Sequence, residues 1–426
     1  MTIHVVQKGE TINSIAEQYG VSAERLMLEN GLTPPIELAV GETIVILYPE
    51  IVYVIQEGDT LDGIADKYKV TIFELLRNNP YLSDREYIYP GETIVISYKG
   101  DKIRSIATNG YAFPFIDMSV LKKTLPFLTY LTIYSYEVTA EGEIGDIDDI
   151  EIIETAKAYG VASVMMLTSL SKSKEEEINV MHSILSSKEI QEHFFNNLLR
   201  ILKEKGYIGV SINTPYIIPT DRSLYEDMVI KFAKLLSKAG YKVFDTLSIR
   251  VFQLLSGTIF TGVDYSKISQ ELDGITLISY SFGYSEGIPP GTTSADVFKR
   301  FIKSSMREIP PEKIYSGVPV IGYIWKFPYI PNESKGMAIT YNSAIQIAIE
   351  YNAEIQYDEI TNSAYFKYTL GDEFIVQFWD ARSIDAFVKL VPELGLKGIS
   401  IWNVMNWFPQ MWLVINSQYD IDKVLK

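Results

Sequence analysis

The chain has 426 residues, with 38 Lys and Arg against 54 Asp and Glu, a net charge of −16, three His and no Cys. The lack of Cys excludes disulfides, thiolate metal sites and a Cys nucleophile, and three scattered His argue against a metal site. The acidic balance argues against sequence-independent binding of nucleic acid, which relies on Lys and Arg. No apolar run reaches the ~18 residues of a membrane span, and the N-terminus lacks a signal-peptide pattern. We therefore expect no cofactor, no metal and no membrane span, and a partner that is a neutral or cationic surface or a small molecule.

The charge is spread unevenly along the chain. Residues 1–99 contain 7 basic and 15 acidic residues, so this first quarter carries −8, half of the net charge. A shift of this kind predicts a domain boundary near residue 100.

The first 99 residues contain a repeat. Val5–Ile12 recurs as Val54–Leu61, and Gly41–Ile46 recurs as Gly91–Ile96. Each copy has the pattern of a strand, two helices and a returning strand, because apolar residues follow helical spacing between two short β-rich runs. We call residues 1–49 module 1 and residues 50–99 module 2.

The repeat closely resembles the LysM module, a β-α-α-β unit. The resemblance implies binding of glycans that contain N-acetylglucosamine, such as peptidoglycan or chitin, between the first strand–helix loop and the loop before the last strand. Roles as turn and cap residues are the alternative for the Gly, Thr and Asn residues at these positions. The implied glycan-binding residues are Gly9, Thr11, Ile12 and Asn30 in module 1 and Gly58, Asp59, Thr60, Leu61, Asn79 and Tyr81 in module 2.

Residues 100–426 alternate β-rich runs with amphipathic helical patterns. Eight such strands over this length predict an α/β fold, a (β/α)₈ TIM barrel, with a doubly wound sheet as the alternative. A small α+β insertion is expected at about 350–380, where extra short strands occur. The candidate barrel strands are Ile103–Thr108, Phe127–Ser135, Ala162–Leu167, Tyr207–Ile212, Lys242–Ile249, Gly274–Tyr280, Ile314–Ile321 and Gly398–Trp402.

The strand ends resemble those of glycoside hydrolase family 18. Within it they are similar to the subgroup that joins two LysM modules to the barrel, the spore-germination, cortex-lytic N-acetylglucosaminidases. The supporting sequences are Phe127–Leu131, Tyr280, Tyr323–Pro328, Trp379–Ser383 and Gly398–Trp402.

The chain departs from this family at the catalytic motif. The family has D-x-x-D-x-D-x-E at the end of strand four, where the Glu protonates the leaving oxygen and the preceding Asp orients the acetamido group. The acid position corresponds here to Asn213 and the acetamide-orienting position to Ser211. Residues 205–220 contain no Asp or Glu, even if the register shifts by one or two. We therefore predict no confident catalytic residue.

Several residues suited to sugar binding remain. Aromatic faces pack on pyranose rings, and a Tyr hydroxyl can bond an acetamide oxygen. The predicted substrate-binding residues are Tyr280, Trp325, Trp402, Asn213 and Ser211. Packing inside the barrel or under a loop is the alternative for each aromatic residue.

Three hypotheses follow. The first is a glycan-binding protein of the spore or cell envelope with an inactive family 18-like barrel, deposited from the mother-cell cytoplasm. The second is an active peptidoglycan N-acetylglucosaminidase with relocated carboxylates. The third is a structural scaffold in a spore layer, whose protein partners the sequence leaves open. The candidate relocated carboxylates are Asp117, Glu137, Asp221, Asp264 and Glu286.

Overall fold

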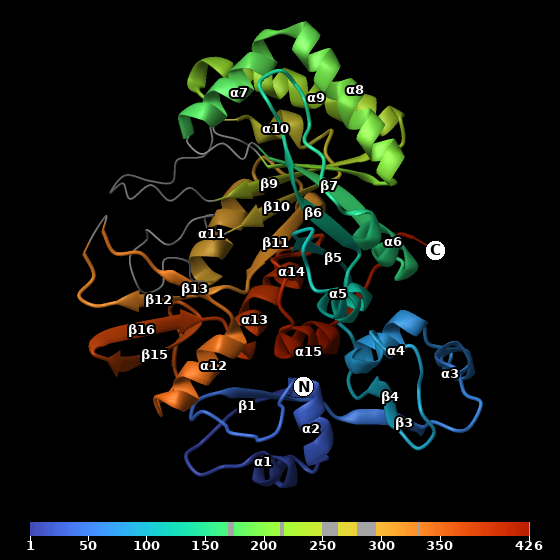
Figure 1. Cartoon of the computed structure of the whole chain (residues 1–426), viewed down its shortest axis with the longest axis vertical. Coiled ribbons are helices and arrows are strands. Elements are labelled where there is room, and N and C mark those ends of the chain that lie inside the picture. The colour runs from blue at the N-terminus through green and yellow to red at the C-terminus, as the bar shows by residue number, and fades with distance from the viewer. Residues whose placement is uncertain (169–173, 214–216, 249–262, 279–294, 331–332, 426) are drawn as a thin grey trace.

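The structure is a computed structural model that describes residues 1–168, 174–213, 217–248, 263–278, 295–330 and 333–425. Two small units at the N-terminus lie against a large barrel (Figure 1). None of the helices in these ranges combines the length and apolar character needed to cross a bilayer.

The two modules have the predicted order of elements. In each, the first and last strands form an antiparallel pair, with Thr2 opposite Ile46 in module 1. Thr11 and Thr60 accept a backbone N–H of the first helical turn, which explains where the first helices begin. The elements are β1 (Thr2–Val5), α1 (Ile12–Tyr19), α2 (Ala23–Asn30), β2 (Thr43–Ile46), β3 (Pro49–Val54), α3 (Leu61–Tyr68), α4 (Ile72–Asn78) and β4 (Thr93–Tyr98).

Eight parallel strands form a closed barrel, so the predicted (β/α)₈ architecture is confirmed and the doubly wound alternative is wrong. The first barrel strand pairs with the last, with Gly398 opposite Ala107, and this pairing closes the sheet. The barrel strands are β5 (Arg104–Ala112), β6 (Tyr130–Glu137), β7 (Ala162–Thr168), β8 (Gly209–Asn213), β9 (Lys242–Ser248), β10 (Gly274–Ile278), β11 (Ile314–Pro319) and β17 (Gly398–Trp402).

Helices surround the barrel, and a short final strand lies beside the first half of β5. The long helices α8 and α9 contain the amphipathic stretches 190–204 and 225–238, which the sequence pattern predicts as helical. The elements are α5 (Met118–Thr124), α6 (Ile150–Ala158), α7 (Lys174–Ser186), α8 (Lys188–Lys205), α9 (Arg222–Lys238), α10 (Tyr265–Ile268), α11 (Ala295–Ser305), α13 (Ala381–Val388), α14 (Leu390–Glu393), α15 (Pro409–Gln418) and β18 (Tyr419–Ile421).

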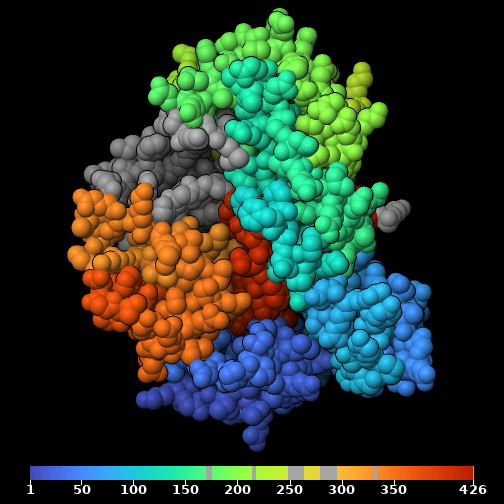
Figure 2. Space-filling model, in the orientation of Figure 1, coloured from blue at the N-terminus to red at the C-terminus, as the bar shows by residue number. Residues whose placement is uncertain are grey.

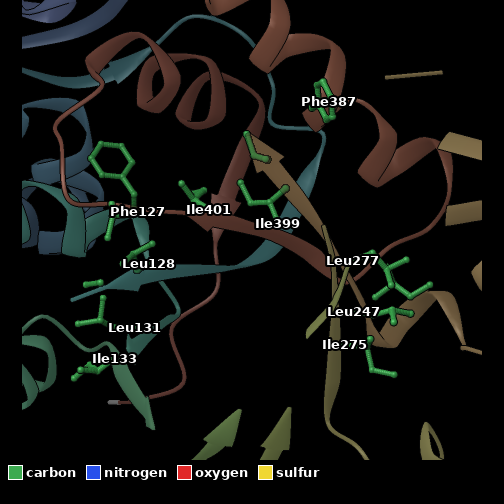
Figure 3. Packing of buried hydrophobic residues seen from close by; sticks show 14 of the residues in the cluster. Phe127, Leu128, Leu131, Ile133, Leu247, Ile275, Leu277, Phe387, Ile399 and Ile401 are labelled. Carbon is green, nitrogen blue, oxygen red and sulfur yellow. The ribbon is translucent and has the colours of Figure 1, made fainter. Parts of the chain in front are cut away.

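The main core lies between the barrel and its helices. Leu131, Ile133, Ile399 and Ile401 are buried there (Figure 3). Successive side chains of a strand point to opposite faces, so the residues between them, such as Ser400, face the barrel interior. Each buried aliphatic side chain contributes about 1.5–3 kcal/mol. The apolar outer face therefore fixes which side chains point inward.

A five-stranded antiparallel sheet is inserted between the last two barrel strands. It begins at Gly322, directly after β11, and ends at Phe378, so it includes residues before the expected 350–380. The sequence Tyr323–Trp325, which we placed at the end of the seventh barrel strand, therefore lies in this sheet. The elements are β12 (Gly322–Lys326), β13 (Met337–Ile339), α12 (Tyr341–Glu350), β14 (Gln356–Asp358), β15 (Ser363–Leu370) and β16 (Asp372–Phe378).

Module 1 packs against the large domain through specific buried contacts. The Thr43 hydroxyl donates to Gln410 Oε1 at 2.7 Å, and Gln410 Nε2 donates to the Thr43 carbonyl at 2.6 Å. The Ile355 N–H donates to the carbonyl of Val40 at 2.8 Å. Figure 2 shows module 1 in dark blue below the orange insertion and the red C-terminal helices. Module 1 is therefore a fixed part of the molecule.

Candidate functional site

The carboxyl ends of the barrel strands form a mouth lined by aromatic side chains. Trp402, at the end of β17, lies 5.2 Å from the ring of Tyr111 and 5.0 Å from that of Tyr134. Barrel enzymes place their sites at this end. Trp402 thus occupies the predicted strand end, but only 9% of its surface is exposed, so packing accounts for most of it.

Among the described residues at the mouth, the sequence did not single out the aromatic side chain with the largest exposure. Phe115 is 77% exposed and stacks on Phe113, with ring centres 5.3 Å apart. Phe113 in turn contacts Tyr134 and Trp402. The signal was the alternation Tyr111-Ala-Phe113-Pro-Phe115, but we ended the first strand at Thr108, four residues too early.

Below the mouth, the barrel interior is polar and neutral. Asn109 donates to Ser400 Oγ at 2.9 Å and accepts from the Thr132 hydroxyl at 2.8 Å. Tyr111 and Thr246 share a hydrogen bond of 2.9 Å, and burial raises the pKa of Tyr111. No Asp or Glu is among the described residues lining this interior cavity. The floor can hold polar groups by hydrogen bonds, but it offers no charge.

Strand β8 carries the positions of the family motif. Alternation along the strand places Ser211 on the inner face, where it is buried beside the neutral network. Asn213 follows two residues later, half-buried and opposite Thr246. Residues 214–216 lie outside the described ranges. β8 itself contains no Asp or Glu, so it supplies no carboxylic acid proton.

Three of the five relocated carboxylates have structural roles. Asp117 caps α5 and accepts the Ser119 N–H at 2.8 Å. Asp221 is buried and lies 2.8 Å from His182 Nδ1 in the helical layer. Asp264 caps α10 and pairs with Lys267 at 3.1 Å. Each carboxylate is explained without chemistry at the mouth.

Two relocated candidates remain. Glu137 is exposed at the end of β6, where it lies opposite Thr168 of β7. Glu286 lies outside the described residues, and it is the only Asp or Glu in the segments that the structure leaves undescribed. A relocated acid must therefore come from Glu137, Glu286 or a carboxylate that the sequence did not single out.

The other two aromatic residues predicted to bind substrate, Trp325 and Tyr280, are not placed at the mouth by the described residues. Trp325 belongs to the inserted sheet, is only 3% exposed, and packs under Gly336 with Tyr329 beside it. Our expectation that it stands at the end of a barrel strand is wrong, because β11 ends at Pro319 and Trp325 lies in β12. Tyr280 lies outside the described residues.

Comparison with known families agrees with this architecture. A model described as Glycosyl hydrolases family 18 matches residues 107–406. The protein belongs to glycosyl hydrolase family 18. The LysM domain model matches residues 4–47 and 53–97, so this family 18 chain carries two LysM modules, as the repeat predicted.

Relatives of similar length share the whole arrangement. The "Cortical fragment-lytic enzyme" of Bacillus subtilis (strain 168) is 28% identical over 432 residues, covering 99% of both chains. The crystal structure of the spore cortex-lytic enzyme SleL of Bacillus megaterium QM B1551 has a TM-score of 0.81 at 27% identity, covering 99% of both chains. A chitinase of Chromobacterium violaceum ATCC 12472 shares the fold, with a TM-score of 0.65 at 18% identity over 74% of this chain and 98% of that one. The predicted resemblance to the spore cortex-lytic type is confirmed.

The equivalent Asn residues of the two LysM modules are structural. Asn30 donates to the carbonyls of Leu26 and Val45 and accepts the Val45 N–H at 2.8 Å. Asn79 makes the same three bonds to Leu75 and Val95. Both side chains are buried and fully used in joining a helix to the last strand. These bonds give both side chains a structural role, and their contact with glycan stays a prediction.

The first loops of both modules remain accessible. Gly9 and Gly58 have a positive φ of 87° and form the same turn. Thr11 and Thr60 cap helices while staying exposed.

The side chains around these loops vary in their burial. Hydrogen bonds from the Gln56 N–H and the Tyr53 hydroxyl lower the pKa of Asp59. Ile12 is buried, whereas Leu61 and Tyr81 are half-buried, with Arg85 over the Tyr81 ring. The loops can present backbone groups to a ligand from an anchored frame.

The three His residues each contact a carboxylate. His4 lies 2.8 Å from Glu10, His182 2.8 Å from Asp221, and His193 2.7 Å from Glu143. Within the described ranges, no group of three His, Cys, Asp or Glu side chains is arranged to hold a metal ion.

Proposed function

We propose that this chain binds N-acetylglucosamine-containing glycan of the spore or cell envelope, through the exposed first loops of its LysM modules and through the barrel mouth. We further propose that β8 gives the barrel no acid, so that binding is not followed by cleavage by the family's usual route. The observation that carries this is the run from 205 to 220 without Asp or Glu.

The absence of an Asp or Glu at the end of β8 removes a group that the usual mechanism of glycoside cleavage requires. The leaving oxygen needs a proton from a carboxylic acid, and general acid catalysis contributes roughly 10²–10⁴ in rate. The amide of Asn213 has no such proton to give. The hydroxyl of Ser211 carries no charge to stabilise a cationic intermediate. The exposed face of Phe115 still suits packing on a pyranose ring.

Binding at the mouth can be tested through Trp fluorescence. All five Trp residues lie beyond residue 320, so their emission reports on the large domain, including α15, where Trp412 lies in the helix that contacts module 1. We expect N-acetylglucosamine oligomers to change this emission. Phe115→Ala should weaken that response about fivefold, because one exposed stacking contact contributes about 1 kcal/mol.

Ile360→Ala is the matched control, because Ile360 is 79% exposed in the turn between β14 and β15 of the insertion. If the oligomers leave the emission of the parent protein unchanged while still binding to the chain, the barrel is a scaffold and only the LysM modules hold glycan.

The second candidate function is an active peptidoglycan N-acetylglucosaminidase. It is supported by the relatives of similar length, which are named as lytic enzymes and match nearly the whole chain. It requires a carboxylate from outside β8, and Glu137 is the exposed candidate at a barrel strand end.

Turnover separates the two functions. Under the first proposal, purified protein releases no new reducing ends from cortex fragments above a heat-treated sample. Under the second, release is clear and Glu137→Gln lowers it by at least about 100-fold, because the acid is gone. Asp117→Asn is the control, since Asp117 caps a helix. Turnover that survives Glu137→Gln would reject both the inactive barrel and the role of Glu137.

A further inference from the structure

A second concave surface lies between module 1 and the inserted region. This groove has a volume of about 530 Å³. One wall is the loop over residues 31–37 that follows α2, and the other is one face of α12, from Tyr341 to Glu350. The groove contains no residue of the first loop of module 1 or of the barrel mouth, but it shares Asn30 and the loop before the last strand with the implied LysM glycan site.

The two walls are held at a fixed separation. The buried Thr43–Gln410 hydrogen bonds and the Ile355–Val40 backbone bond hold module 1 to the large domain. Gly41 fits against the carbonyl of Ile355 only because it has no Cβ. The groove is thus preformed, which lowers the cost of ordering a site on binding.

A buried carboxylate lines the groove without a cation. Glu42 is only 2% exposed, and Oε2 accepts the Ala39 N–H at 3.1 Å. No Lys, Arg or His of the described chain forms an ion pair with it. The equivalent Glu92 of module 2 pairs with Arg85 at 2.8 Å. Burying a carboxylate without a compensating cation costs free energy. A cationic ligand in the groove would lower this cost.

A second buried polar group lies at the same place. Tyr341 is 6% exposed, its ring stacks on Phe408, and its hydroxyl has no hydrogen-bond partner in the structure. Exposed Glu37 and Glu350 add negative charge on opposite walls, and the described lining contains no Lys or Arg. Ile345 and Ile349 supply apolar surface between them.

We propose that this groove binds a glycan-linked primary ammonium group, with Glu42 as its buried counter-ion and Glu37 and Glu350 at its rim. An ammonium has three donors and no acceptor, which matches carboxylate oxygens. The ammonium belongs either to a de-N-acetylated glucosamine or to a free side-chain amine of an attached peptide. The inference rests on the proposed function only in that the ammonium is carried by envelope glycan.

The test measures binding of three probes to the full chain by calorimetry. The probes are a short glucosamine oligomer, an acetylated peptide with one free Lys amine, and an N-acetylglucosamine oligomer. We expect an amine probe to bind, and Glu42→Gln to weaken that binding at least about tenfold while the N-acetylated oligomer is unaffected. Added salt should weaken only the amine probe, since its attraction is ionic. Whichever amine probe binds identifies the source of the ammonium.

Glu92→Gln, the equivalent change in module 2, is the matched control and should leave amine binding unchanged. The double variant Glu37→Gln/Glu350→Gln tests the same groove from its exposed rim and should give a smaller loss. The proposal is overturned if neither amine probe binds, or if both bind equally to the parent and Glu42→Gln proteins. If the amine probe binds but the N-acetylglucosamine oligomer does not, the proposed function is refuted, whereas the proposal for the groove is retained.

Discussion

Gly41→Ala should destabilise the protein far more than Gly91→Ala, although the two residues occupy the same position in the two LysM modules. Both have a positive φ, 85° and 90° respectively, so an Ala at either costs about 1–2 kcal/mol in backbone strain. Only at Gly41 would the new Cβ also lie 1.9 Å from the carbonyl oxygen of Ile355; at Gly91 it meets open space. We expect an additional loss of at least about 3 kcal/mol, because a backbone atom cannot move aside as a side chain can.

Urea unfolding of the two variants and hydrogen exchange at the Ile355 amide measure this difference. The clash should open the Ile355–Val40 hydrogen bond and speed exchange of that amide in Gly41→Ala alone. Equal unfolding free energies in the two variants would mean that module 1 does not pack on the inserted region as described.

Glu42→Gln should change how the stability of the protein depends on pH. Burial raises the pKa of Glu42 from its ordinary value of 4.5 to about 7. The folded state therefore holds this proton more tightly than the unfolded state does. The resulting stability is fully present below pH 4.5 and is lost as the pH rises through 7. The difference between the folded and unfolded pKa of Glu42 corresponds to about 3 kcal/mol of stability. A Gln side chain does not titrate, so the variant does not lose this stability as the pH rises.

The measurement is the unfolding free energy at pH 5 and pH 8 for the parent protein and the variant. Glu42→Gln should be the more stable of the two at pH 8, and the gap should shrink towards pH 5. Near Glu42, Tyr341 stays in its neutral form, and Arg382 is paired with Asp380. Glu92→Gln, which removes a partly exposed ion pair with Arg85, should shift stability by under about 1 kcal/mol at either pH. Parallel curves for the parent and Glu42→Gln would contradict the prediction.

The barrel could be predicted because its outer face has a simple physical signature. Residues such as Leu131 and Ile399 bury apolar side chains against helices, and the resulting β-rich runs recur between amphipathic stretches. The LysM pair could be predicted because a repeated strand-helix-helix-strand pattern is visible without any contact information. The acid-free end of β8 is likewise a property of the sequence alone.

What the sequence could not show depends on contacts between distant segments. Trp325 follows a barrel strand closely, but antiparallel pairing with β16 draws it into the inserted sheet. Phe115 was missed because the β pattern weakens near Gly110, where the barrel strand nevertheless continues to Ala112. Glu42 and Glu92 stand in the same local sequence, Gly-Glu-Thr, and only docking on the large domain distinguishes a buried carboxylate from a partly exposed one.

The bond between Thr43 and Gln410 also has a consequence for synthesis on the ribosome. Its partners are 367 residues apart in the chain. At roughly 5–20 residues per second, the docking face of module 1 waits about 20–70 s before α15 has been made. Module 1 must therefore complete its own small core early and stay soluble with that face uncovered. Assembly of the molecule is complete only when α15 packs against module 1, the first part of the chain to be made.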